Sequence, residues 1–225
     1  MIKAVLIDID DTVLDFNKCA AWAMQIAMEE NGLKYDNSMF PVFRTVNNGF
    51  WSRLEKNEIT FEYLVANRFN AIFKELGITF DGTIIESRFR ELLHESTEEV
   101  DGARDLLIYL HEKYKIYAVS NALQAQQENR LKKGGLIKYF DGIYTSEMLG
   151  ASKPSHTFFD AFFARVGDLK KDEVILIGDS LSADISGGKK YGLMTCWFNA
   201  AGKDPSKGSF SDFTVTSLSA IKAFM

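Results

Sequence analysis

Two groups of acidic residues follow short apolar runs in this chain. Asp8, Asp10 and Asp11 come directly after the first run, and Asp179 and Asp184 follow another run that ends near position 177. Carboxylates at the exit of a buried strand repel one another and lose hydration, which is unfavourable unless a cation or a substrate compensates. A solvated turn is the ordinary interpretation of one acidic pair. Two separate groups favour a binding site, and oxygen-rich sites suit Mg²⁺.

Polar residues also follow apolar segments between these two groups. Ser120 and Asn121 follow residues 116–119, where the opening of a helix would offer N–H groups to an anion. Lys153 stands directly before Pro154, which is expected to start a helix. Taken alone, Ser120 would be a helix N-cap and Lys153 a solvated loop charge. Together with the carboxylates they supply what phosphoryl transfer needs, and the sequence has no Walker-type glycine-rich loop to bind phosphate in another way.

The elements that must position these residues are short runs rich in β-branched residues. From residue 102 onward the runs alternate with helical patterns. This alternation predicts an α/β fold whose parallel sheet is covered by helices on both faces, so that ligands bind beyond the carboxyl ends of the strands. The predicted strands are residues 4–9, 116–120, 142–145, 173–177, 194–198 and 213–215.

A long stretch after the first strand has a different pattern. It contains no good strand, and half of the 18 Phe residues of the chain fall in it, enough for a small core of its own. We therefore predict an inserted all-helical domain at residues 16–97 and a sheet domain made of residues 1–15 and 98–225. The four helices of the insertion are predicted at residues 17–31, 38–56, 60–76 and 82–96. A surface loop is predicted at residues 202–211.

Composition limits the class of protein. The 225 residues carry 26 Lys and Arg against 31 Asp and Glu, a net charge of −5, and 46% of them are apolar. This balance is typical of a globular protein and unfavourable for binding a nucleic acid polymer or an anionic membrane. The only cysteines, Cys19 and Cys196, have no metal or redox spacing, and no secretory or membrane-spanning segment is recognised. We expect a reduced, cytoplasmic protein, either a monomer or a homodimer.

The four segments around Asp8, Ser120, Lys153 and Asp179 resemble, in order, spacing and strand context, the signature of the haloacid dehalogenase superfamily. The resemblance covers essentially the whole chain. It implies a Rossmann-like catalytic core with an inserted helical cap domain. Further features resemble the pyrimidine 5′-nucleotidase branch of that superfamily: Val46-Asn47, Trp51, residues 58–60, Arg68 and residues 195–200.

The resemblance implies a Mg²⁺-dependent phosphomonoester hydrolase. Asp8 would attack phosphorus and form an aspartyl phosphate, and Asp10 would act as general acid and base, oriented by Thr12. The metal would be held by the Asp8 carboxylate, the Asp10 carbonyl and Asp179, and by Asp184 either directly or through water. The phosphate would be held by Thr12, Ser120, Asn121 and Lys153.

Substrate identity is less well specified. The resemblance favours a small phosphorylated metabolite, a nucleoside 5′-monophosphate, as the substrate of a 5′-nucleotidase. Asn47, Trp51 and Arg68 are candidates for reaching it. The ordinary alternatives are a cap core for Trp51, a surface charge for Arg68 and a turn or cap for Asn47.

A sugar-phosphate phosphatase or phosphomutase would keep both Asp8 and Asp10, so this alternative function remains open. Three further classes of protein fit the sequence less well. A dehalogenase has no use for Asp10 or Mg²⁺. A phospho-signalling receiver domain would be about half as long, and a non-catalytic phosphate-binding protein would not need every catalytic group.

Overall fold

The computed structural model describes residues 1–208 and 210–225 and divides the chain into two compact units. The first unit combines Met1–Asp15 with Thr97–Met225, and the second is Phe16–Ser96. Thr97, predicted as the last residue of the insertion, lies in the first unit. The two segments that connect the units run side by side: Leu14 and Glu99 form an antiparallel bridge, and the Asp15 N–H donates to the Glu98 carbonyl over 2.9 Å.

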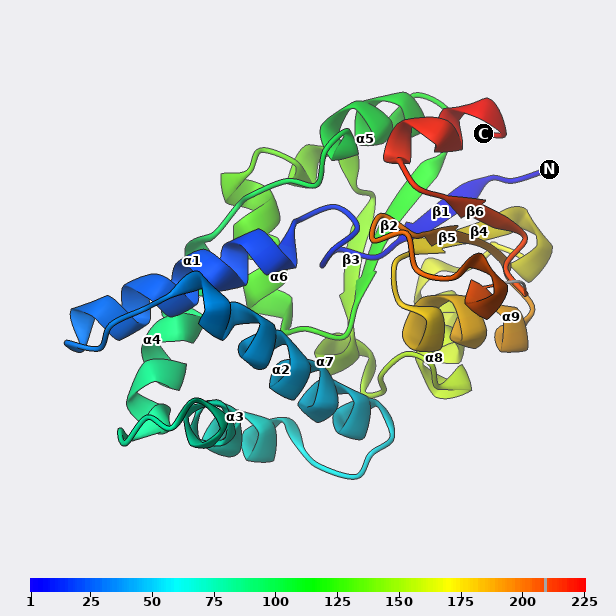
Figure 1. The fold of residues 1–225 in the computed structure, drawn as a ribbon. Helices are drawn as coiled ribbons and strands as arrows, with labels where there is room; N and C mark the ends of the chain where they lie inside the picture. Colours follow the sequence, from blue (N-terminus) through cyan, green and yellow to red (C-terminus); the bar gives the residue numbers. More distant parts are fainter. Residues whose placement is uncertain (209) are drawn as a thin grey trace. The chain divides into compact units, whose positions relative to one another are not determined.

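The first unit is built on a six-stranded sheet (Figure 1). Every neighbouring pair of strands is parallel, and the order is β3-β2-β1-β4-β5-β6. The strands occupy the six predicted places: β1 Ala4–Ile7, β2 Lys115–Ser120, β3 Gly142–Thr145, β4 Val174–Gly178, β5 Met194–Phe198 and β6 Phe213–Val215. The predicted α/β fold is therefore confirmed.

Both faces of the sheet are apolar and covered. In β1, Val5 and Ile7 pack into one core and Ala4 and Leu6 into the other, as the two-residue period of a strand requires. The first core takes residues from α5 (Ala103–His111), α6 (Gln124–Lys133) and a 3₁₀ helix, Leu218–Ala223. The second takes residues from α7 (Ser146–Leu149), α8 (His156–Val166) and α9 (Gly187–Tyr191). This double burial explains the continuous apolar runs in the sequence.

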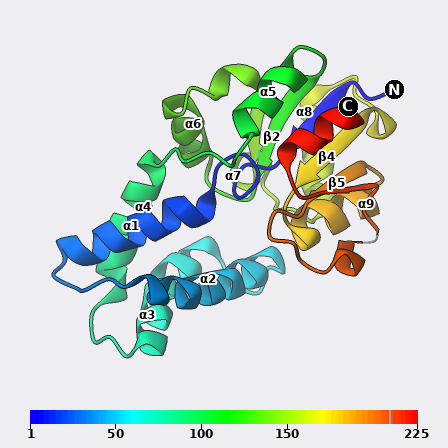
Figure 2. The ribbon, with the colours of Figure 1, turned by 45° about the horizontal axis from the view of Figure 1, so that its top comes forward.

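The second unit is helical (Figure 2). It has its own apolar core. In it α1 packs on α4, α4 on α3 and α3 on α2. Thr60 caps α3 by accepting from the Tyr63 N–H, and Gly77 ends it with a left-handed φ of +68°, a conformation that favours glycine. The helices are α1 Phe16–Glu30, α2 Phe40–Glu55, α3 Phe61–Leu76 and α4 Gly82–Glu95, with a 3₁₀ turn at Asn37–Met39.

Two helices of the first unit begin later than the sequence suggests. The helix expected to open at Ser120 begins at Gln124, so an irregular segment follows β2. The helix expected to start at Pro154 begins at His156, because Ser155 is its N-cap and accepts from the Thr157 N–H. These shifts leave residues 121–123 and 151–155 in irregular segments.

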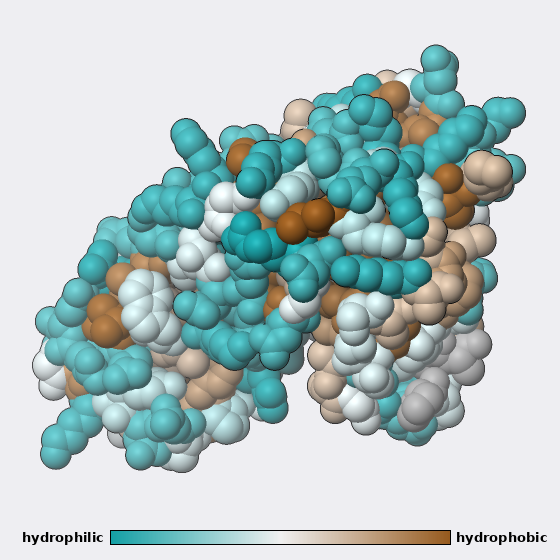
Figure 3. Space-filling model, turned by 90° about the horizontal axis from the view of Figure 1, so that it is seen from above, coloured by the Kyte–Doolittle hydropathy of each residue, from teal (hydrophilic) through white to brown (hydrophobic). Residues whose placement is uncertain are grey.

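The predicted loop 202–211 contains a short 3₁₀ turn, Pro205–Gly208, and Ser209 lies outside the described residues. The face seen in Figure 3 is mostly hydrophilic, with apolar side chains in small groups. Among the described residues, no helix combines the length and the apolar character needed to cross a membrane.

Candidate active site

The parallel register of β1 and β4 brings two acidic residues together. Ile7 pairs with Ile177, and the Asp8 N–H continues the ladder by donating to the Ile177 carbonyl over 2.9 Å. Asp8 and Asp179 each follow at the carboxyl end of its strand, near the centre of the sheet. The backbone ladder therefore fixes their separation.

Asp184 joins this pair through a turn of the chain. It lies in the π-helical turn Leu181–Ser186, and its Oδ2 accepts from the Ser180 N–H at 3.1 Å. Gly178 makes room for it, because a Cβ at position 178 would lie 2.2 Å from Asp184 Oδ2. One carboxylate oxygen from each of Asp8, Asp179 and Asp184 lies within 4.8 Å of the others. Such a cluster can hold a divalent cation.

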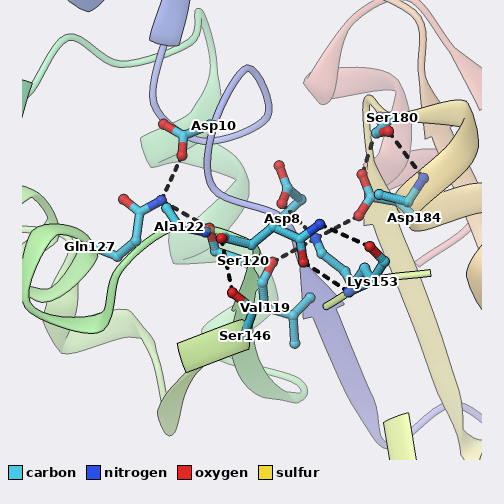
Figure 4. A network of polar contacts seen from close by, with 12 residues as sticks. Asp8, Asp10, Val119, Ser120, Ala122, Gln127, Ser146, Lys153, Ser180 and Asp184 are labelled. Carbon is cyan, nitrogen blue, oxygen red and sulfur yellow. Dashed lines mark hydrogen bonds and ion pairs between the residues drawn. The ribbon is translucent and has the colours of Figure 1, made fainter. Parts of the chain in front are cut away.

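Lys153 is buried at the centre of the site (Figure 4). Its ammonium donates to Asp8 Oδ1 at 2.7 Å, to Asp184 Oδ1 at 2.6 Å and to the Val119 carbonyl at 2.9 Å. An ammonium has three hydrogens, so these contacts use all of them. A contact between Lys153 and a phosphate would have to replace one of them.

Asn121 positions the backbone of Lys153. Its Nδ2 donates to the Lys153 carbonyl at 2.9 Å, and its Oδ1 accepts from the Lys153 N–H at 2.8 Å. This reciprocal pair holds the segment after β2 against the segment that carries the lysine. The side chain of Asn121 thus serves to position the lysine segment, and its backbone carbonyl accepts from Ser146 Oγ at 2.9 Å.

The charged forms of the clustered carboxylates are unfavourable in this site. Burial raises the pKa of Asp8 to about 8; Lys153 opposes this rise and the charge of Asp184 adds to it. Desolvation, followed by the charges of Asp8 and Asp184, holds the pKa of Asp179 well above its usual value. Although burial lowers the pKa of Lys153, Asp184 and Asp8 raise it above its usual value. One ammonium does not compensate three clustered acids, and a divalent cation would.

Ser120 and Thr12 are both buried close to the strand ends. Ser120 Oγ accepts from the Ala122 N–H at 3.1 Å and from Gln127 Nε2 at 3.0 Å, which leaves its own hydrogen to donate to a ligand. Thr12 Oγ1 has no hydrogen-bond partner among the described residues. The predicted contact in which Thr12 orients Asp10 is therefore not formed in this structure.

Asp10 contacts two residues of α6 that the sequence did not single out. Arg130 Nη1 donates to Asp10 Oδ1, and Gln127 Nε2 donates to Asp10 Oδ2, both over 2.6 Å. Gln127 and Arg130 lie one turn apart on the buried face of α6. Leu131 is the only apolar residue among the three buried residues of this helix, so the sequence pattern of α6 does not single out the pair.

Two further details concern the loops that carry the acids. Trp197 on β5 is buried, and its Nε1 donates to the Asp179 carbonyl at 3.0 Å, which holds the start of that loop. Asp11 adopts a left-handed φ of +59°, and its charge contributes to the raised pKa of Asp179. The charge of Asp11 therefore acts on the acidic cluster.

The candidate specificity residues are placed differently from one another. Arg68 and Asn47 are both buried in the core of the helical unit. Arg68 donates twice to Glu86, at 2.6 and 3.0 Å, and once to Asn47 Oδ1, at 2.8 Å. Because its guanidinium is used in this network, the structure does not support Arg68 as a substrate contact, and it is not a surface charge either. Trp51 is half-buried, with its ring 6.3 Å from that of Phe61.

Breaking the Arg68–Glu86 pair should destabilise the helical unit. Glu86→Gln leaves a buried guanidinium without its counter-charge, and we expect a loss of about 3–5 kcal/mol in the free energy of unfolding, measured with urea. Arg88→Gln, which removes the exposed pairs of Arg88 with Glu30 and Glu91, is the control and should change the free energy of unfolding much less. Similar small losses for both variants would contradict a structural role for Arg68.

Comparisons with known proteins point to one family. The family described as haloacid dehalogenase-like hydrolase matches residues 2–192. The crystal structure of the putative HAD-hydrolase YfnB from Bacillus subtilis, bound to magnesium and described as revealing interdomain movement, has a TM-score of 0.92 and 33% identity, covering 99% of this chain and 97% of that one. By sequence, YfnB is 36% identical over 197 residues, which is 88% of this chain and 84% of YfnB.

Several relatives carry names of phosphatases. The pyrimidine 5′-nucleotidase PynA of Streptococcus pneumoniae is 33% identical over 198 residues, 88% of this chain and 84% of PynA. The pyrimidine 5′-nucleotidase YjjG of Escherichia coli is 29% identical over 214 residues, 95% and 93% of the two chains. A glyceraldehyde 3-phosphate phosphatase of Pyrococcus furiosus is more distant, at 25% over 227 residues, 96% and 90% of the two chains.

These similarities extend over both units and over the strand ends that carry the acidic cluster. The chain is an enzyme, and its nucleotidase relatives support phosphatase activity. It belongs to the haloacid dehalogenase-like hydrolase family.

Proposed function

We propose that this chain is a magnesium-dependent phosphomonoester hydrolase that acts through an aspartyl phosphate, with nucleoside 5′-monophosphates as its substrates. The observation that carries the proposal is a buried group of charges at the carboxyl ends of β1 and β4. In this group Lys153 contacts both Asp8 and Asp184, and Asp179 directly follows β4. The similarity to PynA and YjjG supports the choice of nucleotides.

The residues of the acidic cluster fit a magnesium ion. Asp8, Asp179 and Asp184 would supply carboxylate oxygens, and the Asp10 backbone carbonyl would supply another. The raised pKa values of Asp8 and Asp179 support the fit, because clustered acids of this kind are stable as carboxylates only beside a cation. When bound, magnesium would neutralise charge so that an anionic phosphate can approach an anionic carboxylate.

We assign the chemical roles as the family resemblance implies them. A carboxylate oxygen of Asp8 attacks phosphorus, and the bond from phosphorus to the leaving oxygen breaks. Asp10 donates a proton to that oxygen and later takes one from the water that hydrolyses the acyl phosphate. Ser120, the N–H groups near Asn121 and the ammonium of Lys153 hold the phosphate oxygens and their transition-state charge.

Gly178 should be essential for cation binding. Gly178→Ala places a methyl group against Asp184 and displaces its carboxylate, so we expect the affinity for Mg²⁺, measured by isothermal titration calorimetry, to fall about tenfold or more. Gly49→Ala is the control, because a Cβ there meets nothing within 4 Å. Unchanged Mg²⁺ affinity in a folded Gly178→Ala protein would exclude Asp184 from the cation site.

We propose that the helical unit selects the substrate, with Trp51 stacking on the base. Loss of a stacking contact is worth about 1–3 kcal/mol, so Trp51→Ala should lower kcat/KM for a pyrimidine nucleotide roughly ten- to a hundredfold. A small aryl phosphate has no base, and its turnover should fall much less. Equal losses for both substrates in a folded variant would show that Trp51 does not contact the base.

The whole proposal is tested by phosphate release from nucleoside monophosphates, sugar phosphates and an aryl phosphate, each with and without Mg²⁺. We expect activity only with the cation and the highest kcat/KM for a pyrimidine nucleotide. A clear preference for sugar phosphates would overturn the nucleotide assignment and leave the hydrolase. Binding without turnover of any phosphate would overturn the hydrolase as well.

A further inference from the structure

Arg130 and Gln127 of α6 form a buried polar network with Asp10 and Ser120 (Figure 4 shows Gln127 between Asp10 and Ser120). Gln127 Nε2 donates to Asp10 Oδ2 at 2.6 Å and to Ser120 Oγ at 3.0 Å, and Gln127 Oε1 accepts from Arg130 Nη1 at 3.2 Å. Gln127 and Arg130 have no exposed side-chain surface. Every polar atom of the Gln127 amide is therefore engaged, and its orientation is fixed.

The network holds both oxygens of Asp10 from one side. Arg130 binds Oδ1 and Gln127 binds Oδ2, while about a quarter of the Asp10 side chain stays exposed. A carboxyl group held at both oxygens cannot rotate freely, and its exposed part can meet a ligand. The fold thus anchors Asp10 through α6.

Two separate cationic side chains pair with the acidic residues of the site. Lys153 pairs with Asp8 and Asp184, whereas Arg130 pairs with Asp10. The nucleophile and the proton-transfer group therefore have different partners on different elements. This division allows the position of Asp10 to be altered through α6 without removing the partner of Asp8.

We propose that Gln127 and Arg130 are positioning residues that hold Asp10 for proton transfer and couple it to the phosphate-binding hydroxyl of Ser120; this inference rests on the proposed function. As the bond from phosphorus to the leaving oxygen breaks, its electron pair stays on that oxygen, which takes the proton of Asp10. Asp10 becomes an anion, and Arg130 stabilises it. Gln127 donates to both Asp10 and Ser120, so it fixes the position of the proton donor relative to the hydroxyl that binds the phosphate.

The test compares leaving groups of different basicity. Weakly basic leaving groups depart without a proton, whereas alkoxides require one, and general acid catalysis is worth about 10²–10⁴-fold. We expect Arg130→Met to lower kcat/KM about 100-fold for an alkyl phosphate and about threefold for 4-nitrophenyl phosphate. Gln127→Leu should follow the same trend and also raise KM, because it removes a contact to Ser120.

Three variants separate positioning from general damage to the protein. Arg130→Lys keeps the cation and should restore part of the activity towards the alkyl phosphate. Lys132→Met removes an exposed cation from the same helix, and Gln126→Leu changes the residue before Gln127; both should behave as the parent. If Arg130→Met does not fold, Arg130→Lys and Gln127→Leu carry the comparison.

A double-substitution cycle completes the test. Asp10→Asn removes the proton donor, so adding Arg130→Met to it should cause little further loss with the alkyl phosphate. Additive losses, or equal losses for all leaving groups, would overturn the inference. If instead the unaltered enzyme hydrolyses no phosphate monoester, the proposed function fails, and the two outcomes are thereby distinguished.

Discussion

Asp8→Asn is expected to lower kcat by at least about 10⁴-fold, which corresponds to about 5.4 kcal/mol in the activation free energy. The carboxamide keeps the shape of the side chain but is a far weaker nucleophile, so no aspartyl phosphate forms. The measurement is steady-state phosphate release at saturating Mg²⁺. Acid quenching during turnover should trap phosphorylated protein for the parent and none for the variant.

The same variant should fold at least as well as the parent. Asp8 is buried, and its raised pKa shows that burial disfavours its charge, so a neutral amide removes an unfavourable term. Thermal unfolding in EDTA checks this point and ensures that the lost activity is chemical in origin. Activity within about tenfold of the parent would contradict the covalent mechanism, because that change is only about 1.4 kcal/mol.

Lys153→Met should combine a loss of activity with a loss of stability. It removes the shared partner of Asp8 and Asp184, both buried, and we expect the free energy of unfolding in EDTA to fall by about 3–5 kcal/mol. Activity should fall about 10³-fold, because the phosphate also loses a cationic donor. Added Mg²⁺ should stabilise this variant more than it stabilises the parent, because the cation then compensates acids that have no other partner.

An exposed ion pair provides the control for this variant. Lys189 pairs with Asp212 near the surface, and Lys189→Met should lose about 1 kcal/mol or less and keep its activity. Urea unfolding with EDTA and with Mg²⁺ gives both comparisons. Equal stability of Lys153→Met and the parent in EDTA would contradict the central role of the lysine in the acidic cluster.

The elements of the sheet were predictable because their signals are local. An apolar run rich in β-branched residues marks each strand, and the turn residues after it mark the end. The predictions for β3, β5 and β6 agree with the structure at both ends. The positions of Asp8 and Asp179 followed from these runs, because parallel strands place their carboxyl ends at the same edge.

The contacts that the sequence did not reveal join distant residues. Asp10 and Arg130 lie on different elements, and only the packing of α6 against the sheet brings them together. Arg68 was expected to contact the substrate or to be a surface charge, whereas the structure buries it in a pair with Glu86. Patterns of polarity describe single side chains, whereas a buried ion pair depends on two elements at once.

The two segments that connect the units also affect how the chain folds. β1 lies at the centre of the sheet, between β2 and β4, yet both partners come after the helical unit in the chain. The antiparallel bridge of Leu14 with Glu99 holds the ends of that unit side by side. A helical unit that folds first therefore connects β1 to β2 as a short loop would. The chain entropy lost when β1 docks against β2 is then smaller. During synthesis the inserted helices emerge before β2 and can prepare β1 for pairing.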